Sequence, residues 1–171
     1  MQVAIFAMRV LEVMFFVGLA GSTVVVIISF VEDGNLVPAT QDLSRLQSGM
    51  TAMLQRAKAA ADRTIYIADT PRPVTNPVNC LADKGLVEDC VLMTSDAIDS
   101  GYAATEEAAA VASGVPIIRP ADFLCATDIC PLVFGNTLVY RDASHITATF
   151  SATLAPILGW YLDVGLSSGT T

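Results

Sequence analysis

The pattern of apolar and polar residues divides the chain into two parts. Residues 13–31 carry no charged side chain, and most of them are apolar. A bilayer-spanning helix needs about 20 apolar residues, so this run is long enough to cross a membrane. Beyond residue 42, apolar residues recur at shorter intervals among polar ones, as in a folded domain. The pattern therefore predicts an N-terminal transmembrane helix followed by a globular domain.

Residues 13–31 have two other interpretations, a buried core helix and a cleaved signal peptide. A core helix is rarely apolar on every face over this length. The apolar region of a signal peptide is normally about 7–15 residues long and ends at a small-residue site, whereas this run is longer and is followed by Glu32-Asp33. Arg9 lies before the run, so the positive-inside tendency places the amino terminus in the cytoplasm. We expect an uncleaved single-pass anchor with the remaining chain outside.

The rest of the chain predicts alternating helices and strands. Apolar residues spaced three or four apart predict a helix over residues 42–62, and the β-prone run 64–68 is typical of a buried parallel strand. An Ala-rich helix is expected over 102–113, with a strand candidate at 115–118. This alternation indicates an α/β fold.

Glycine and proline mark the connections. Residues 69–79 hold three prolines and predict an extended loop. Gly135-Asn136 lies between two short apolar stretches and predicts a hairpin. A closing helix is expected over 147–162, kinked or broken by Pro156.

Composition narrows the class of partner. The net charge is −8, and only 15% of residues are charged. No cluster of Lys and Arg is available to neutralise phosphates. We therefore expect no nucleic-acid partner.

The only histidine of the chain, His145, follows Asp142 by three positions. Histidine is the usual base near neutral pH, and a carboxylate can fix its tautomer and stabilise the imidazolium. The alternative is a surface turn in which Asp142 or Ser144 caps the following helix. The D-x-x-H spacing alone does not decide between them.

The motifs around this pair occur in a recognisable order. C-x-x-x-x-C-P spans 125–131, G-N-x-L-x-Y-R-D-x-x-H-I-T spans 135–147, and L-A-P spans 154–156. In this order the sequence resembles the C-terminal part of the extracytoplasmic SGNH domain of bacterial membrane acyltransferases, which O-acylate cell-surface polysaccharide. The resemblance extends back to Ile67-Ala68-Asp69-Thr70-Pro71-Arg72-Pro73 and covers residues 46–162.

The resemblance carries expectations about fold and function. It implies part of a three-layer, flavodoxin-like α/β fold with a parallel sheet. It also implies that His145 and Asp142 are the base and its orienting partner in a Ser-His-Asp triad acting on O-acyl groups of cell-envelope glycans. Behind the expected anchor, the domain would lie outside a bacterial inner or cell membrane. The implied partners are the membrane, an acyl-glycan substrate and an acyltransferase chain, with no cofactor.

Four cysteines allow three disulfide pairings. The short intervals and the resemblance, which places each pair in one loop, favour Cys80–Cys90 and Cys125–Cys130. A zinc site is the alternative, but the spacings lack C-x-x-C and one histidine cannot complete a second site. Disulfides agree with a location outside the cytoplasm. No metal site is expected.

The expected domains are an anchor at 1–35, unrelated to the resembled family, a linker at 36–45, the C-terminal half of an SGNH-like domain at 46–165, and a tail at 166–171. The resembled family carries its nucleophilic serine in a Gly-Asp-Ser block after the first strand. This chain has no such block. The candidate nucleophiles are Ser22, Ser48, Ser95 and Ser100, and none of them follows a strand at the amino end of the domain. Asn136 comes too late to match the family's asparagine.

Three hypotheses therefore stay open. The first is an acyltransferase or esterase whose serine comes from an unassigned position or from a partner chain. The second is a non-catalytic remnant or interaction module of an acyltransferase system. The third is an unrelated small membrane protein with a disulfide-stapled outer domain. Whether the chain is an enzyme is undecided at this stage.

Overall fold

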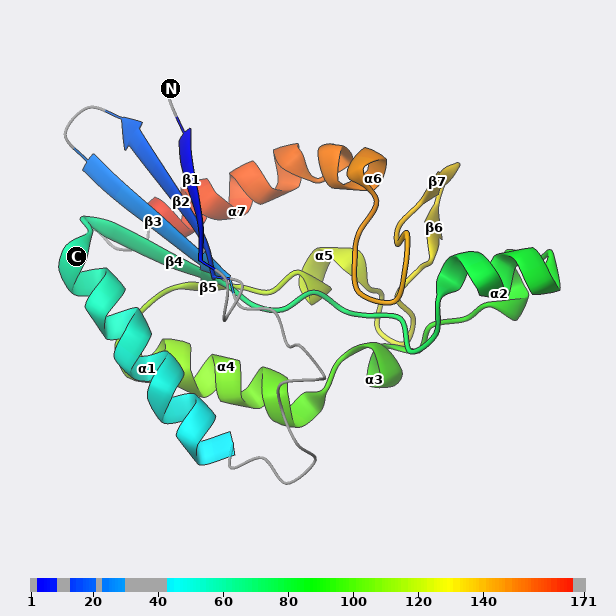
Figure 1. Cartoon of the computed structure of the whole chain (residues 1–171), viewed down its shortest axis with the longest axis horizontal. Coiled ribbons are helices and arrows are strands. Elements are labelled where there is room, and N and C mark those ends of the chain that lie inside the picture. The colour runs from blue at the N-terminus through cyan, green and yellow to red at the C-terminus, as the bar shows by residue number, and fades with distance from the viewer. Residues whose placement is uncertain (1–2, 9–12, 21–22, 30–42, 168–171) are drawn as a thin grey trace. The chain divides into compact units, whose positions relative to one another are not determined.

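The computed structural model describes residues 3–8, 13–20, 23–29 and 43–167, and the side chains of residues 43–164 (Figure 1). The chain forms two compact units. Residues 1–69, 101–119 and 161–171 make up the first, here called the sheet unit. Residues 70–100 and 120–160 make up the second, here called the disulfide unit.

The sheet unit is built on one five-stranded sheet whose strands follow one another in chain order. The three N-terminal strands pair antiparallel, and β3, β4 and β5 pair parallel. Parallel neighbours need a crossover, and a helix supplies it between β3 and β4 and again between β4 and β5. The strands are β1 Val3–Met8, β2 Val13–Ala20, β3 Thr23–Ser29, β4 Arg63–Ile67 and β5 Ile117–Ile118.

The predicted membrane helix over residues 13–31 is wrong where the structure describes that run. It forms two strands, β2 and β3, and the register pairs Ala20 with Thr23 across Gly21-Ser22. Residues 23–28 are all β-branched, which favours strand over helix. Two consecutive apolar strands make a run as long as a membrane helix, so the length of the run did not distinguish them. Of the described helices, none is long and apolar enough to span a bilayer.

Two crossover helices share a core with β4. They are α1 Leu43–Ala60 and α4 Ser100–Ser113, which lie side by side in Figure 1. Leu54 of α1, Tyr66 of β4 and Ala109 of α4 are fully buried together. The predicted helices 42–62 and 102–113 and strand 64–68 are thereby confirmed. A small parallel sheet with helical crossovers confirms the α/β class, and the third layer stays a prediction.

Hydrogen bonds of polar side chains also stabilise the sheet unit. Glu106 is only 3% exposed, and its carboxylate accepts hydrogen bonds from the Tyr66 hydroxyl and, at 3.0 Å, from the Asp69 amide. Burial, with the Glu106 charge second, raises the pKa of Tyr66 far above its ordinary value. The Lys58 ammonium donates to the Gly114 carbonyl at 2.8 Å, at the end of α4. Gly114 has a φ of 62°, a conformation that favours glycine.

The disulfide unit has shorter elements and two covalent links. Cys80 bonds to Cys90 and Cys125 to Cys130, with Cα–Cα distances of 6.0 and 4.0 Å. Both predicted pairings are confirmed. Cys90 and Cys130 are buried in the apolar core of this unit. The elements are α2 Pro77–Lys84, η1 Val87–Asp89, α3 Thr94–Ala97, α5 Ala121–Leu124, β6 Val133–Phe134, β7 Thr137–Leu138, α6 Ala148–Thr153 and the start of α7 Ala155–Ser167.

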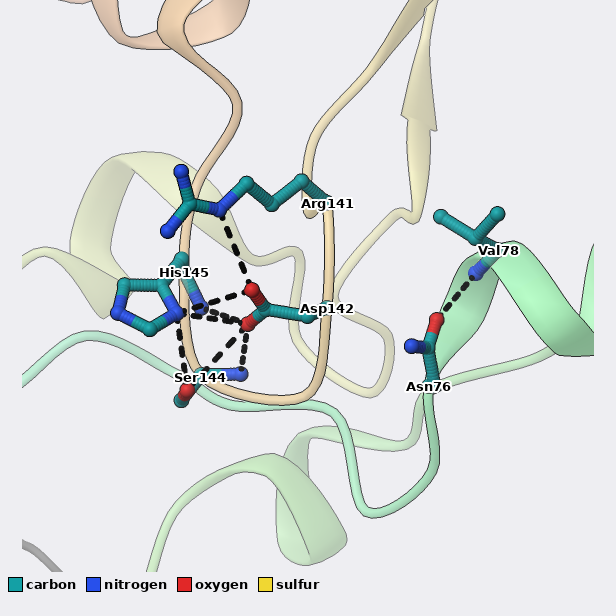
Figure 2. Close-up of polar contacts among 6 residues, drawn as sticks. All are labelled: Asn76, Val78, Arg141, Asp142, Ser144 and His145. Carbon is teal, nitrogen blue, oxygen red and sulfur yellow. Dashed lines mark hydrogen bonds and ion pairs between the residues drawn. The ribbon is translucent and has the colours of Figure 1, made fainter.

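Helix α2 was missed, because the prolines of residues 69–79 predicted only a loop. Asn76 is its N-cap: the side-chain oxygen accepts from the Val78 amide at 2.9 Å (Figure 2). Pro77 occupies the first turn, where its missing N–H costs nothing, and Gly85 ends the helix with a φ of 78°. The Asn-Pro pair and the later glycine are a helix start and stop signal that was readable in the sequence.

Two predictions for the C-terminal part are confirmed, the hairpin at Gly135-Asn136 and the break in the closing helix. Gly135, with a φ of 58°, and Asn136 connect β6 to β7 as a hairpin. The closing helix is broken into α6 and α7 at Leu154, two residues before Pro156. Of the expected linker 36–45, residues 36–42 lie outside the described residues, as do residues 168–171 of the tail.

Candidate active site

The candidate chemistry lies on a closed loop of the disulfide unit between β7 and α6. The Arg141 amide donates to the His145 carbonyl at 3.0 Å, and Tyr140 and Ile146 form an isolated antiparallel bridge. The Thr147 amide donates to the Val139 carbonyl at 2.8 Å. These backbone bonds bring the two ends of the loop 141–145 together.

Thr147 fixes the exit of this loop. Its hydroxyl donates to the Leu138 carbonyl at 2.6 Å and accepts from the Phe150 amide at 3.1 Å. The second bond makes Thr147 the N-cap of α6. Asp142 and Ser144, the residues suggested as alternative caps, do not cap the helix.

Within the loop, the Asp142 carboxylate faces the His145 imidazole (Figure 2). Nδ1 of His145 lies 2.8 Å from Oδ1 and 3.0 Å from Oδ2 of Asp142. An ionised carboxylate only accepts hydrogen bonds, so the neutral ring must carry its proton on Nδ1. Nε2 is then the nitrogen with a free lone pair, as a base requires.

The loop backbone holds the carboxylate in its ionised form. Oδ1 accepts from the amides of Ser144 at 2.9 Å and His145 at 2.8 Å, and Oδ2 accepts from Nε of Arg141 at 3.2 Å. The pKa of Asp142 is therefore far below its ordinary value, chiefly because of the Ser144 amide. Desolvation opposes this shift, and the imidazole, Arg141 and the His145 amide lower the pKa further.

The imidazole is exposed, as predicted. The His145 side chain is 57% exposed and that of Asp142 35%. In the described part of the chain, Nε2 of His145 has no hydrogen-bond partner. The predicted placement at the carboxyl edge of the sheet stays a prediction.

One hydroxyl lies beside the ring, that of Ser144. Its Oγ is 3.1 Å from Nδ1 of His145 and 3.3 Å from Oδ1 of Asp142. In a Ser-His-Asp triad the serine and the aspartate bind opposite ring nitrogens. Because Ser144 lies on the nitrogen that Asp142 already binds, it does not have the geometry of a triad nucleophile.

Three of the four serines named as candidate nucleophiles lie in helices. Ser48 lies within α1 and donates to the Ser44 carbonyl at 2.8 Å. Ser95 lies within α3, and Ser100 is the first residue of α4. Ser22 falls outside the described residues.

Ser29 is not among the serines that the sequence indicated as candidate nucleophiles. It is the last residue of β3, where its Cα pairs with that of Ile67 in the parallel neighbour β4. Catalytic and ligand-binding groups of α/β folds commonly follow the carboxyl ends of parallel strands. The β-branched run that precedes Ser29 could have indicated a strand and drawn attention to this serine.

The described residues contain no group of three or more His, Cys, Asp and Glu side chains placed to hold a metal ion. The four cysteines are instead consumed by the two disulfides.

Comparisons with known proteins bear on the family and the fold of the chain. A family model described as "SGNH domain (fused to AT3 domains)" matches residues 7–159, starting before the predicted resemblance and including β2 and β3. No curated protein matches the chain. The periplasmic domain of a lipopolysaccharide acetyltransferase from Salmonella ser. Paratyphi A is similar in structure, with a TM-score of 0.61 and 18% identity over 81% of this chain. The chain spans 56% of that structure's length, and at this identity the likeness concerns the fold.

Proposed function

The chain belongs to the family of SGNH domains fused to AT3 domains, and from this membership we propose that it transfers or hydrolyses O-acyl esters with His145 as its base. The observation that carries the proposal is the state of the imidazole. Nδ1 is held by an ionised carboxylate, while the side chain is 57% exposed and Nε2 has no partner among the described residues (Figure 2). This is the resting arrangement of a general base.

In the proposed reaction, Nε2 of His145 takes the proton of a serine hydroxyl as its oxygen attacks the acyl carbonyl. The carbonyl then reforms and the ester's alcohol leaves with the proton from the imidazolium, which gives an acyl-serine. Water or a glycan hydroxyl, deprotonated by the same ring, then attacks the acyl-serine, and the imidazolium returns the proton to the serine oxygen as the acyl group leaves. Asp142 stabilises the imidazolium at each proton transfer.

Ser29 is the serine to test first as the nucleophile. Its position at the end of β3, the first parallel strand, matches the place after the first strand where the resembled family carries its serine. The sequence around it departs from the family pattern, because Ile28 precedes it and no Gly-Asp is present. Oxyanion donors are not assigned.

The proposed setting is extracytoplasmic, beside a bacterial membrane. The two disulfides support it, because such bonds persist in oxidising compartments. The family's fusion to AT3 domains and the periplasmic source of the similar structure support an acyltransferase chain as partner and acylated envelope glycans as substrate. Protease added to intact cells should remove a C-terminal tag, and a protected tag would contradict this setting.

The test of the activity combines covalent labelling with ester hydrolysis. The full chain is treated with a fluorophosphonate probe, and 4-nitrophenyl acetate hydrolysis is followed in parallel. We expect His145→Ala to abolish both signals, and Ser29→Ala to abolish labelling. The matched control is Ser151→Ala, which removes an exposed serine of α6 and should retain both. Hydrolysis that survives in His145→Ala would contradict the proposed base.

One observation favours a second function, that of a non-catalytic remnant or interaction module. The sequence has no Gly-Asp-Ser block. If the wild-type chain neither labels nor hydrolyses the ester, this alternative is supported. Labelling that appears when an acyltransferase chain is added would instead indicate that the partner chain supplies the nucleophilic serine.

A further inference from the structure

Arg141 makes a contact with the candidate dyad that the proposed function does not use. Its Nε donates to Oδ2 of Asp142 at 3.2 Å, and its side chain is 62% exposed. An exposed ion pair of this kind contributes little to stability. Figure 2 shows the guanidinium on the side of the carboxylate away from the Ser144 amide.

The two oxygens of Asp142 are held by different kinds of partner. Oδ1 accepts from two backbone amides, those of Ser144 and His145, and from the Ser144 hydroxyl at 3.3 Å, all of which the loop itself supplies. Oδ2 accepts from Arg141 and lies 3.0 Å from the imidazole Nδ1. A carboxylate anchored through Oδ1 alone can turn about its Cβ–Cγ bond, whereas a second anchor on Oδ2 fixes its plane.

The orientation of the Asp142 carboxylate plane affects the hydrogen bond to the His145 imidazole. Nδ1 of His145 lies almost equally far from Oδ1 and Oδ2, at 2.8 and 3.0 Å, so the N–H points between the two oxygens. Ser144 Oγ, 3.1 Å from the same nitrogen, offers a competing partner that can donate to Nδ1 and so favour the other tautomer. Rotation of the carboxylate would therefore weaken its hold on the tautomer that the base requires.

We propose that Arg141 is a positioning residue: its guanidinium locks the plane of the Asp142 carboxylate and thereby keeps the proton of His145 on Nδ1. The inference deepens the proposed function and rests on it for its catalytic consequence. The tautomer itself is a property of the folded chain whether or not an ester is cleaved.

The single histidine makes the test direct, because the chain has one imidazole. Nitrogen-15 NMR of the full chain at alkaline pH reports which ring nitrogen carries the proton. We expect the Nδ1–H form to dominate in the wild type and the Nε2–H form to become substantial in Arg141→Gln. Arg141→Lys, which keeps a cation near Oδ2, should restore part of the wild-type ratio.

The matched control is Arg119→Gln. Arg119 is also a half-exposed arginine bound to a carboxylate, that of Glu107, at 2.8 Å through Nε, but it belongs to the sheet unit. Its loss should leave the ring spectrum unchanged. An unchanged tautomer ratio in Arg141→Gln would overturn the inference, whatever the ester assay shows.

Kinetics give the second readout. In Arg141→Gln we expect kcat on 4-nitrophenyl acetate to fall about tenfold with KM unchanged, well short of the roughly 10⁴-fold loss that a wholly wrong tautomer causes in serine proteases. A rise in KM alone would mean that Arg141 binds substrate, and would contradict the positioning role. Absence of His145-dependent hydrolysis in the wild type would contradict the proposed function, while the NMR ratio would still decide the role of Arg141.

Discussion

The two units of this chain are stabilised in different ways. The sheet unit relies on strand ladders and on a core in which Leu54 and Tyr66 are fully buried between helix and strand. The disulfide unit has strands of two residues and two helices of four, and it carries both disulfides. Both units bury an apolar core, but the sheet unit builds its core from long elements, whereas the disulfide unit joins short elements by covalent links.

This difference shows where candidate chemistry can be placed. Asp142 and His145 lie on a loop whose shape is set by hydrogen bonds among its own residues and its immediate neighbours. Such a loop keeps its polar side chains exposed without loss of order. In the sheet unit the comparable carboxylate, that of Glu106, is buried and accepts hydrogen bonds from the Tyr66 hydroxyl and the Asp69 amide. The following predictions test this contrast.

The largest effect is expected in the core of the sheet unit. Leu54→Ala should cost about 2–5 kcal/mol in the free energy of unfolding, because Leu54 is 0% exposed and truncation leaves a cavity. Leu43→Ala on the same helix is the matched control, since that side chain is 38% exposed and should cost far less. Urea unfolding followed by circular dichroism measures both. Equal losses would remove the proposed basis of this unit's stability.

The next effect concerns the covalent links. Replacing both Cys125 and Cys130 with Ala should cost about 2 kcal/mol, as expected for a short cross-linked loop, with separation 5. Hydrogen exchange read by mass spectrometry should show faster exchange in residues 120–150 than in β4. If the amides of β4 lose equal protection, the two units unfold together and the contrast between them fails.

Two buried tyrosines should respond in opposite directions. Tyr66→Phe removes the hydroxyl that Glu106 accepts and should cost about 1–3 kcal/mol. The Tyr140 hydroxyl is buried without a partner among the described residues, and burial raises its pKa to about 12. Tyr140→Phe should therefore be neutral or stabilising by up to about 1 kcal/mol. Denaturant midpoints of the two variants decide, and destabilisation by Tyr140→Phe would point to a missed partner.

The smallest effect is expected at the base itself. His145→Ala should change the free energy of unfolding by no more than about 0.5 kcal/mol, because the imidazole is 57% exposed and its one described carboxylate partner keeps other donors. Denaturant unfolding at neutral pH is the measurement. A loss of about 1–3 kcal/mol would mean that the histidine serves structure.

The predictable parts of the fold are those with local signals. Helix α1 and strand β4 follow from their apolar periodicity, and Gly114 marks the end of α4. Short intervals together with the family resemblance identified the cysteine pairs, and Pro156 identified the break between α6 and α7. The D-x-x-H spacing brought Asp142 and His145 together because a tight loop joins residues three apart.

The rest depended on context that spacing does not contain. Residues 13–31 have the hydropathy of a membrane helix, and only the β-branched stretch within β3 distinguishes two strands from it. Because the run was interpreted as an anchor, Ser29 at the end of β3 was not considered. Helix α2 was not predicted because proline usually ends a helix. In the first turn, however, proline is favourable, and Pro77 lies there.

Thr147 also bears on how quickly the loop can form. Its hydroxyl bond to the Leu138 carbonyl closes a stretch of nine residues, and closure of a loop near this length takes about 10–100 ns. The parallel pairing of Val25 with Arg63 has to wait for the whole crossover between them. The dyad-bearing loop can therefore close early and repeatedly while the chain is still searching for its sheet. Thr147→Ser would keep both hydrogen bonds and this early closure, whereas Thr147→Val would lose both.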